Sequence, residues 1–161
     1  MVSLWVVNAS PIILLAKVGL VDVLQRLGAP VVIPAAAVQE IQRGAPTDPG
    51  IQALAQASWL ATVDPPSISN AVSTFNLGPG ESAVLEWAFA NPGSGVLIDD
   101  QAARHAAAVL SIPHQGTLGL VVVAKAQGLI AAARPVMEQL RQQGMYLSDQ
   151  IMNQALAQVG A

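Results

Sequence analysis

The sequence predicts an α/β sandwich built around a parallel sheet. Short apolar runs of strand type alternate along the chain with segments of helical periodicity, which is the pattern of parallel α/β proteins. The runs Pro30–Pro34 and Val96–Ile98 are almost wholly apolar, as expected for strands buried on both faces. The 161 residues, 53% apolar and 11% charged, suit one domain (1–161) with a single core.

The first half of the chain begins with a buried strand, Leu4–Asn8, and a short helix. Ser10 is the expected N-cap of that helix, and Pro11 suits its first helical position. The elements expected next are a short helix (Val21–Gly28), a strand (Pro30–Pro34), helices at Ala35–Gly44 and Ile51–Ser58, and a strand (Trp59–Asp64).

The second half begins with Pro65–Gly80, which has the composition of a long loop with a turn of helix inside it. A helix then starts at Glu81, because the apolar residues after it recur on one helical face. The elements expected after it are a strand (Val96–Ile98), a helix (Gln101–Ser111), a short strand (Ile112–Gln115) and three helices (Thr117–Leu129, Ala131–Gly144, Ser148–Gly160).

The composition narrows the functional classes. A net charge of −3 argues against a protein that binds nucleic acid through bulk positive charge. The absence of cysteine excludes disulfides and thiolate metal sites. The longest uncharged stretch, His105–Ala124, contains Pro113 and is a poor membrane span, and the N-terminus lacks a signal-peptide pattern. We therefore expect a cytoplasmic protein with no membrane partner.

Oxygen-bearing side chains occur where strands meet helices. Asp99 and Asp100 follow a predicted strand, Asn8 ends the first one, Glu40 lies in the helix after the second, and Glu81 opens a later helix. Ligands of parallel sheets bind beyond the carboxyl ends of the strands, so these five residues are expected to converge at one edge.

Each of these residues also has a structural interpretation. Asp100 would cap its helix, worth about 1 kcal/mol, while Asp99 would face solvent. Glu81 would gain roughly 0.3–1 kcal/mol from the helix dipole. The two other structural interpretations are a surface ion pair of Glu40 with Arg43 and an Asx-turn at Asn8.

If folding brings these carboxylates close together, the structural interpretations no longer explain them. Two carboxylates about 4 Å apart repel by roughly 4 kcal/mol at an effective dielectric near 20. Proton sharing or a hard divalent cation would offset that repulsion. Zinc is disfavoured, because there is no cysteine and His105 and His114 lack ligand spacing.

Five segments, in this order, resemble the PIN domain, and in particular a branch related to the VapC-type toxins of bacterial toxin–antitoxin pairs. The resemblance covers about residues 3–147, and a C-terminal helix at 148–159 follows it. The segments are VVNASPIILLAKVG, VVIPAAAVQEIQRG, LGPGESAVLEWA, VLIDDQAAR and PHQGTLGLVVVAKAQGLI.

The resemblance implies a three-layer α/β/α sandwich and a ribonuclease that depends on Mg²⁺ or Mn²⁺. The residues that match the family's acidic positions are Asn8, Glu40, Glu81 and Asp100, with Asp99 beside the last. Ser10 and Thr117 match its hydroxyl positions and, with Arg104, are the expected substrate contacts. Asn8 departs from the usual first Asp and removes one negative charge from the site.

If the protein is active, Asp100 and Glu81 are the expected metal ligands and Glu40 completes the acidic ring. Asp99 is then either a ligand or an orienting group. Arg104 would meet a phosphate, although a solvated helix face explains it equally well. The resemblance also implies RNA as substrate, a cognate antitoxin and a homodimer.

Two other functions stay open. A PIN-like scaffold without catalysis would bind RNA or a protein partner, and Asn8 and the acidic net charge favour it. A phosphoacceptor domain would use the Asp99–Asp100 pair with Thr117 and Lys125, but in that family the acidic pair follows the first strand. The apolar segments Leu20–Leu27 and Ile51–Leu60 are either a partner surface or core helices.

Overall fold

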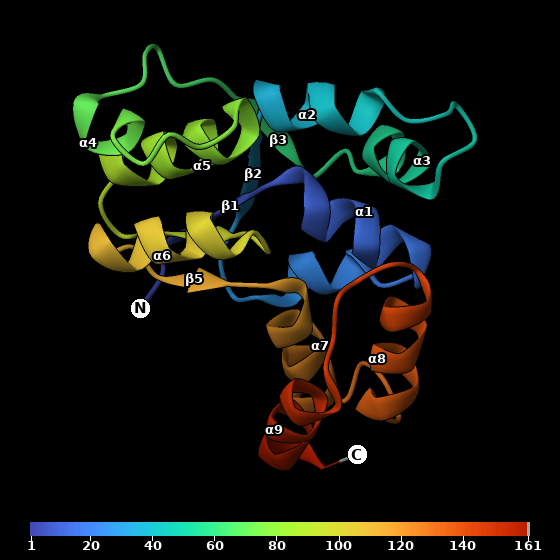
Figure 1. Cartoon of the computed structure of the whole chain (residues 1–161). Helices are drawn as coiled ribbons and strands as arrows, with labels where there is room; N and C mark the ends of the chain where they lie inside the picture. Colours follow the sequence, from blue (N-terminus) through green and yellow to red (C-terminus); the bar gives the residue numbers. More distant parts are fainter. Residues whose placement is uncertain (161) are drawn as a thin grey trace.

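The computed structural model describes residues 1–160, and a sheet of five parallel strands lies at its centre (Figure 1). The strands are β1 (Leu4–Val7), β2 (Val31–Pro34), β3 (Ala61–Val63), β4 (Ser94–Leu97) and β5 (His114–Gln115). Their order across the sheet is β3-β2-β1-β4-β5, and every neighbouring pair is parallel. The strand order reverses between β1 and β4, and such a switch point is where parallel sheets bind ligands.

The helices occupy the predicted segments, with shifts of a few residues at their ends. They are α1 (Ala9–Lys17), the 3₁₀ helix η1 (Val21–Arg26), α2 (Ala35–Gln42), α3 (Pro49–Gln56), α4 (Asn70–Ser73), α5 (Pro79–Ala90), α6 (Gln101–Val109), α7 (Thr117–Ala126), α8 (Ala133–Gln142) and α9 (Asp149–Val159). The order of helices and strands expected from apolar periodicity is thereby confirmed.

The strands alternate their side chains between two helical layers, as the two-residue period of a strand requires. Val7, Ile33 and Leu97 belong to one core cluster with residues of α1, η1 and α7, and side chains of α3 pack against it. Val6 and Val96, one residue earlier in their strands, belong to a second cluster with α4, α5 and α6. The structure is therefore the three-layer α/β/α sandwich with a central parallel sheet that was predicted.

A third core cluster joins α7, α8 and α9 into a C-terminal lobe, residues 117–159, on one side of the sandwich (Figure 1). Fully buried Met137 and Leu140 of α8 meet Met152 of α9 in this lobe. Ser148 caps α9, because its hydroxyl oxygen accepts a hydrogen bond of 3.1 Å from the Ile151 amide.

Three local expectations are wrong. Helix α1 begins at Ala9 with Asn8 at the N-cap position, so Ser10 is not the cap, and the Asn8 side chain makes no capping bond or Asx-turn. Strand β4 starts at Ser94, two residues earlier than predicted. The strand includes Gly95, and the missing side chain there leaves room for the ring of Trp5 on the neighbouring strand. A Cβ on Gly95 would come within 2.6 Å of a ring carbon.

The two apolar segments proposed as a partner surface belong to the core. Leu24, Ala57 and Leu60 are buried in the first cluster, and Leu20, Leu27, Ile51 and Leu54 pack against it. The interpretation as core helices is therefore the one the structure supports. Within residues 1–160, no helix is both long enough and apolar enough to cross a membrane.

Candidate active site at the carboxyl edge of the sheet

Asp99 is the most firmly held side chain at the switch point. One carboxylate oxygen, Oδ2, accepts hydrogen bonds from the Ser10 hydroxyl (2.9 Å) and the Thr117 hydroxyl (2.7 Å). The other, Oδ1, accepts the Thr117 amide N–H at 2.7 Å. Hydrogen bonds to a carboxylate are stronger than neutral ones, so these three bonds fix the carboxylate where α1, β4 and α7 meet.

The chain folds this way because Ser10, Asp99 and Thr117 each lie two or three residues beyond the end of a strand. Asn8 follows β1 and its amide still bonds to the Leu97 carbonyl at 3.0 Å, which places Ser10 beside the end of β4. Ile98 likewise donates to the Gln115 carbonyl at 2.9 Å, which places Thr117 on the other side. The carboxyl ends of β1, β4 and β5 thus converge on Asp99.

Asp100, the next residue, has a different role. Its carboxylate accepts the Ala103 amide at 2.9 Å and caps α6, and it does not line the cleft described below. Of the two neighbouring aspartates, Asp99 is therefore the one that lines the cleft, and Asp100, expected to be a main ligand, serves as a helix cap. Adjacent residues of an extended segment point in opposite directions, so only one of the pair faces the site.

Asn8 and Glu40 approach each other across Gly80, a buried residue in the first turn of α5. A Cβ on Gly80 would lie 3.0 Å from both Asn8 Oδ1 and Glu40 Oε2, so the two oxygens are no further apart than the sum of these distances. Asn8 is 3% exposed, and its Oδ1 has no hydrogen-bond partner. A buried acceptor without a partner is costly, which makes this oxygen a natural ligand for a water or a cation.

Glu81 does not line the same hollow as Asp99. It lines a small cavity of about 220 Å³ between α2 and the start of α5, and its Oε2 bends back to within 2.9 Å of the position a Cβ would take on Gly78. Glu40 lines both this cavity and the main cleft. Among residues 1–160, no three Asp, Glu or His side chains lie close enough to hold one metal ion together. The predicted acidic ring is therefore not closed.

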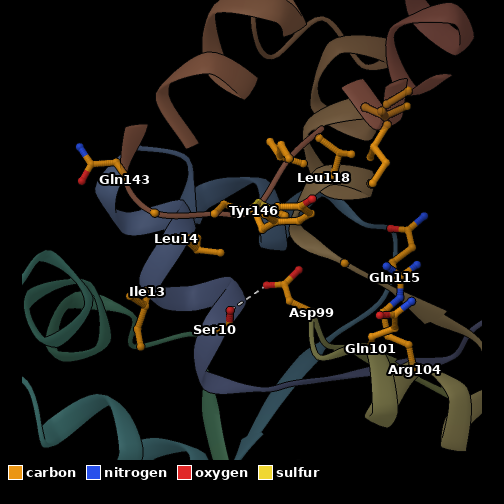
Figure 2. A pocket seen from close by; sticks show the side chains of 18 of the residues that line it. Ser10, Ile13, Leu14, Asp99, Gln101, Arg104, Gln115, Leu118, Gln143 and Tyr146 are labelled. Atoms are coloured by element: carbon orange, nitrogen blue, oxygen red, sulfur yellow. Dashed lines mark hydrogen bonds between the residues drawn. The ribbon is translucent and has the colours of Figure 1, made fainter. Parts of the chain in front are cut away.

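The main cleft has a volume of about 1100 Å³ and runs from Asp99 to the C-terminal lobe (Figure 2). Its sandwich side includes Ser10, Glu40 and Asp99, and its lobe side includes residues of α7 and α9. Asp99 points toward this opening in Figure 2, with the Ser10 bond drawn beneath it. A substrate in the cleft would therefore meet a fixed carboxylate at one end.

The predicted substrate contacts divide into two groups. Ser10 and Arg104 line the cleft, and an Arg104 guanidinium nitrogen lies 3.5 Å from where a Gly116 Cβ would be. Thr117 is fully buried, so it positions Asp99 and cannot touch a substrate, which corrects the expectation. The ion pair considered between Glu40 and Arg43 is not found among the described residues. Lys125, considered for a phosphoacceptor site, donates a hydrogen bond of 3.0 Å to the Ala131 carbonyl.

Three residues that the sequence did not single out also matter. Gly80 separates Asn8 from Glu40, and its only signal was its place in the LGPGE segment. Tyr146 lines the cleft and is the single tyrosine of the chain. Glu86 is buried within α5, and its carboxylate accepts a hydrogen bond of 2.6 Å from the Ser69 amide, which holds the loop before α4 in place. In the sequence, the apolar residues around Glu86 predicted only a core helix.

A family model for the PIN domain matches residues 4–161. The chain therefore belongs to the PIN domain family. PIN domains are generally nucleases and typically use divalent metals, so the family supports a hydrolase at that coarse level. A search of curated proteins found no match to the sequence.

Proposed function

We propose that the protein is a divalent-metal-dependent ribonuclease of the VapC type that hydrolyses RNA phosphodiesters. The observation that carries this proposal is the position of Asp99. This carboxylate is fixed by Ser10 and Thr117 at the switch point of the sheet and opens into a cleft large enough for a strand of nucleic acid.

The residues at the site fit Mg²⁺ or Mn²⁺. Both ions prefer oxygen ligands, and the unpartnered Asn8 Oδ1 next to the Glu40 carboxylate supplies two of them. Asn8, Glu40 and Asp99 would hold the ion. A bound divalent ion would offset the charge that develops on the scissile phosphate and make water a better nucleophile.

The chain's own groups would then orient the substrate. Ser10 and Thr117 keep the Asp99 carboxylate in one position, which lowers the cost of organising the site during the reaction. Arg104, on the same wall of the cleft, would contact a phosphate of the strand. Glu81, in the neighbouring cavity, would act only through its negative charge.

The experiment follows cleavage of a labelled single-stranded RNA with Mn²⁺, with a chelator, and in matched variants. We expect cleavage with Mn²⁺, none with chelator, a loss of at least about a hundredfold in Asp99→Asn, and near-parent activity in Asp100→Asn. Equal cleavage by Asp99→Asn and the parent would refute the site. Circular dichroism of each variant checks that it is folded.

A second candidate function is a catalytically degenerate PIN scaffold that binds RNA or a protein partner. Asn8 in place of an acid and the absence, among residues 1–160, of three clustered carboxylates favour it. Asn8→Asp separates the two functions. If this variant cleaves RNA and the parent does not, the natural chain is a degenerate enzyme.

We further propose that the protein acts as the toxin of a toxin–antitoxin pair and forms a homodimer. Both statements rest on the resemblance to VapC-type proteins, because the apolar segments first considered as a partner surface are part of the core. Light scattering at micromolar concentration tests the dimer. A monomeric mass would count against it.

A further inference from the structure

We infer that the C-terminal lobe binds the unpaired bases of a single RNA strand, with Tyr146 as a stacking platform and a set of glutamines as hydrogen-bonding partners. The inference rests on the proposed function, because it names the form of the substrate and the part of the cleft that recognises it.

Tyr146 is held with its ring outward. It lies in the loop between α8 and α9, where Leu147 is buried in the core of the lobe and Met145 packs against that core. The side chain of Tyr146 between them is 88% exposed and makes no hydrogen bond within the described residues. An exposed aromatic ring on a backbone that its two neighbours hold in place is suited to stack on a flat ligand.

The polar residues that line the cleft are mainly amides. Ile151, Gln154 and Gln158 are spaced three and four residues apart in α9, so they form one stripe, and all three line the cleft. Other glutamines of the lining are Gln101, Gln115 and Gln143 (Figure 2). An amide both donates and accepts hydrogen bonds, as the edges of nucleobases do, whereas phosphates only accept them.

The charges in the cleft argue against a mode of binding in which protein cations on phosphates supply most of the affinity. The charged residues that line it are Glu40, Asp99 and Arg104, so one cation faces two carboxylates. The chain as a whole carries a net charge of −3. In the absence of a metal ion, we therefore expect most of the affinity to come from the bases, and unpaired bases are available only in single-stranded segments.

The cleft is also continuous with the proposed catalytic end. Asp99 and Tyr146 border the same opening in Figure 2, although they come from the sandwich and the lobe respectively. A strand with a phosphodiester at Asp99 would extend its neighbouring nucleotides over α7 toward Tyr146.

The test measures binding of a fluorescent single-stranded RNA of about ten nucleotides by anisotropy, in chelator so that nothing is cleaved. We expect Tyr146→Ala to raise Kd about tenfold, as for loss of one stacked base, and Tyr146→Phe to bind like the parent. Phe89→Ala is the matched control, because Phe89 is an aromatic residue 42% exposed on α5 outside the cleft, and it should leave Kd unchanged.

Three further arms test base recognition. An abasic oligonucleotide with the same phosphates should bind at least tenfold more weakly, and a duplex of the same sequence likewise. The slope of log K against log salt should stay below about one in magnitude, since one cation lines the cleft. No binding by the parent, equal binding of the abasic strand, or an unchanged Kd in Tyr146→Ala would overturn the inference.

Failure of the nuclease proposal can be distinguished from failure of base recognition by the C-terminal lobe. If the parent binds in this pattern but does not cleave RNA with Mn²⁺, the nuclease proposal fails and base recognition stands. If the parent cleaves while Tyr146→Ala binds and cleaves equally well, the nuclease proposal stands and the lobe is not its recognition element.

Discussion

Replacing Asp99 by alanine should destabilise the protein far more than the same change at Asp100. The Asp99 carboxylate accepts three hydrogen bonds of 2.7–2.9 Å, and two of the donors belong to fully buried Thr117. Hydrogen bonds to charged groups contribute about 1.5–3 kcal/mol each, and buried donors left unpaired cost about 1–3 kcal/mol each. Because Asp99 is partly exposed, we expect a loss of about 3–5 kcal/mol.

Asp100→Ala removes only the N-cap bond to Ala103, which is worth about 1 kcal/mol. The loss of stability in Asp99→Asn should lie between those of Asp99→Ala and Asp100→Ala, because one oxygen remains to accept a hydrogen bond from Thr117.

Urea unfolding, followed by circular dichroism, measures the difference. With a slope near 2 kcal/mol per molar urea, the midpoint should fall by about 1.5–2.5 M for Asp99→Ala and by about 0.5 M for Asp100→Ala. Equal shifts in the two variants would refute the reasoning, since they would mean that the Asp99 carboxylate is not held by its three donors. A change in slope between variants would instead show that compactness had altered.

Three other predictions follow from single contacts. Gly80→Ala should weaken Mn²⁺ binding by about tenfold or more in calorimetry, because the added methyl group would fill the space between two candidate ligand oxygens. Gly119→Ala is the control and should leave Mn²⁺ binding unchanged, because the nearest atom to its added Cβ is 3.5 Å away. Glu86→Ala should lower the free energy of unfolding by about 2–3 kcal/mol, whereas Glu86→Gln, which keeps an acceptor, should cost about 1 kcal/mol or less. Ser148→Ala should cost about 1 kcal/mol in thermal unfolding through loss of the α9 cap, and an unchanged melting temperature would contradict that assignment.

Much of the fold could be predicted from local patterns. Apolar runs such as Val31–Pro34 became central strands because residues buried on both faces of a parallel sheet leave no room for alternation. The residue at which α1 begins was less predictable. Ser10 has the chemistry of an N-cap, but its hydroxyl bonds instead to Asp99, a partner 89 residues away that local sequence cannot reveal.

The site was predicted as a set of residues but not as a geometry. Placing Asn8, Asp99 and Asp100 at one edge required only the rule that ligands bind at the carboxyl ends of parallel strands. Deciding that Asp99 faces the cleft and Asp100 caps a helix required the orientation of the backbone after β4. That Glu81 lines a different hollow from Asp99 depends in the same way on how the start of α5 packs against α2.

The sequence by itself determined the order of helices and strands and the oxygen-bearing residues near the carboxyl ends of the strands, because periodicity and residue type act over a few neighbouring positions. The tertiary structure decided which oxygens meet, which aspartate is fixed, and that the C-terminal helices form the far wall of the cleft. Those outcomes depend on packing between segments more than a hundred residues apart, and a side chain's direction there is set by partners that only the folded chain brings together.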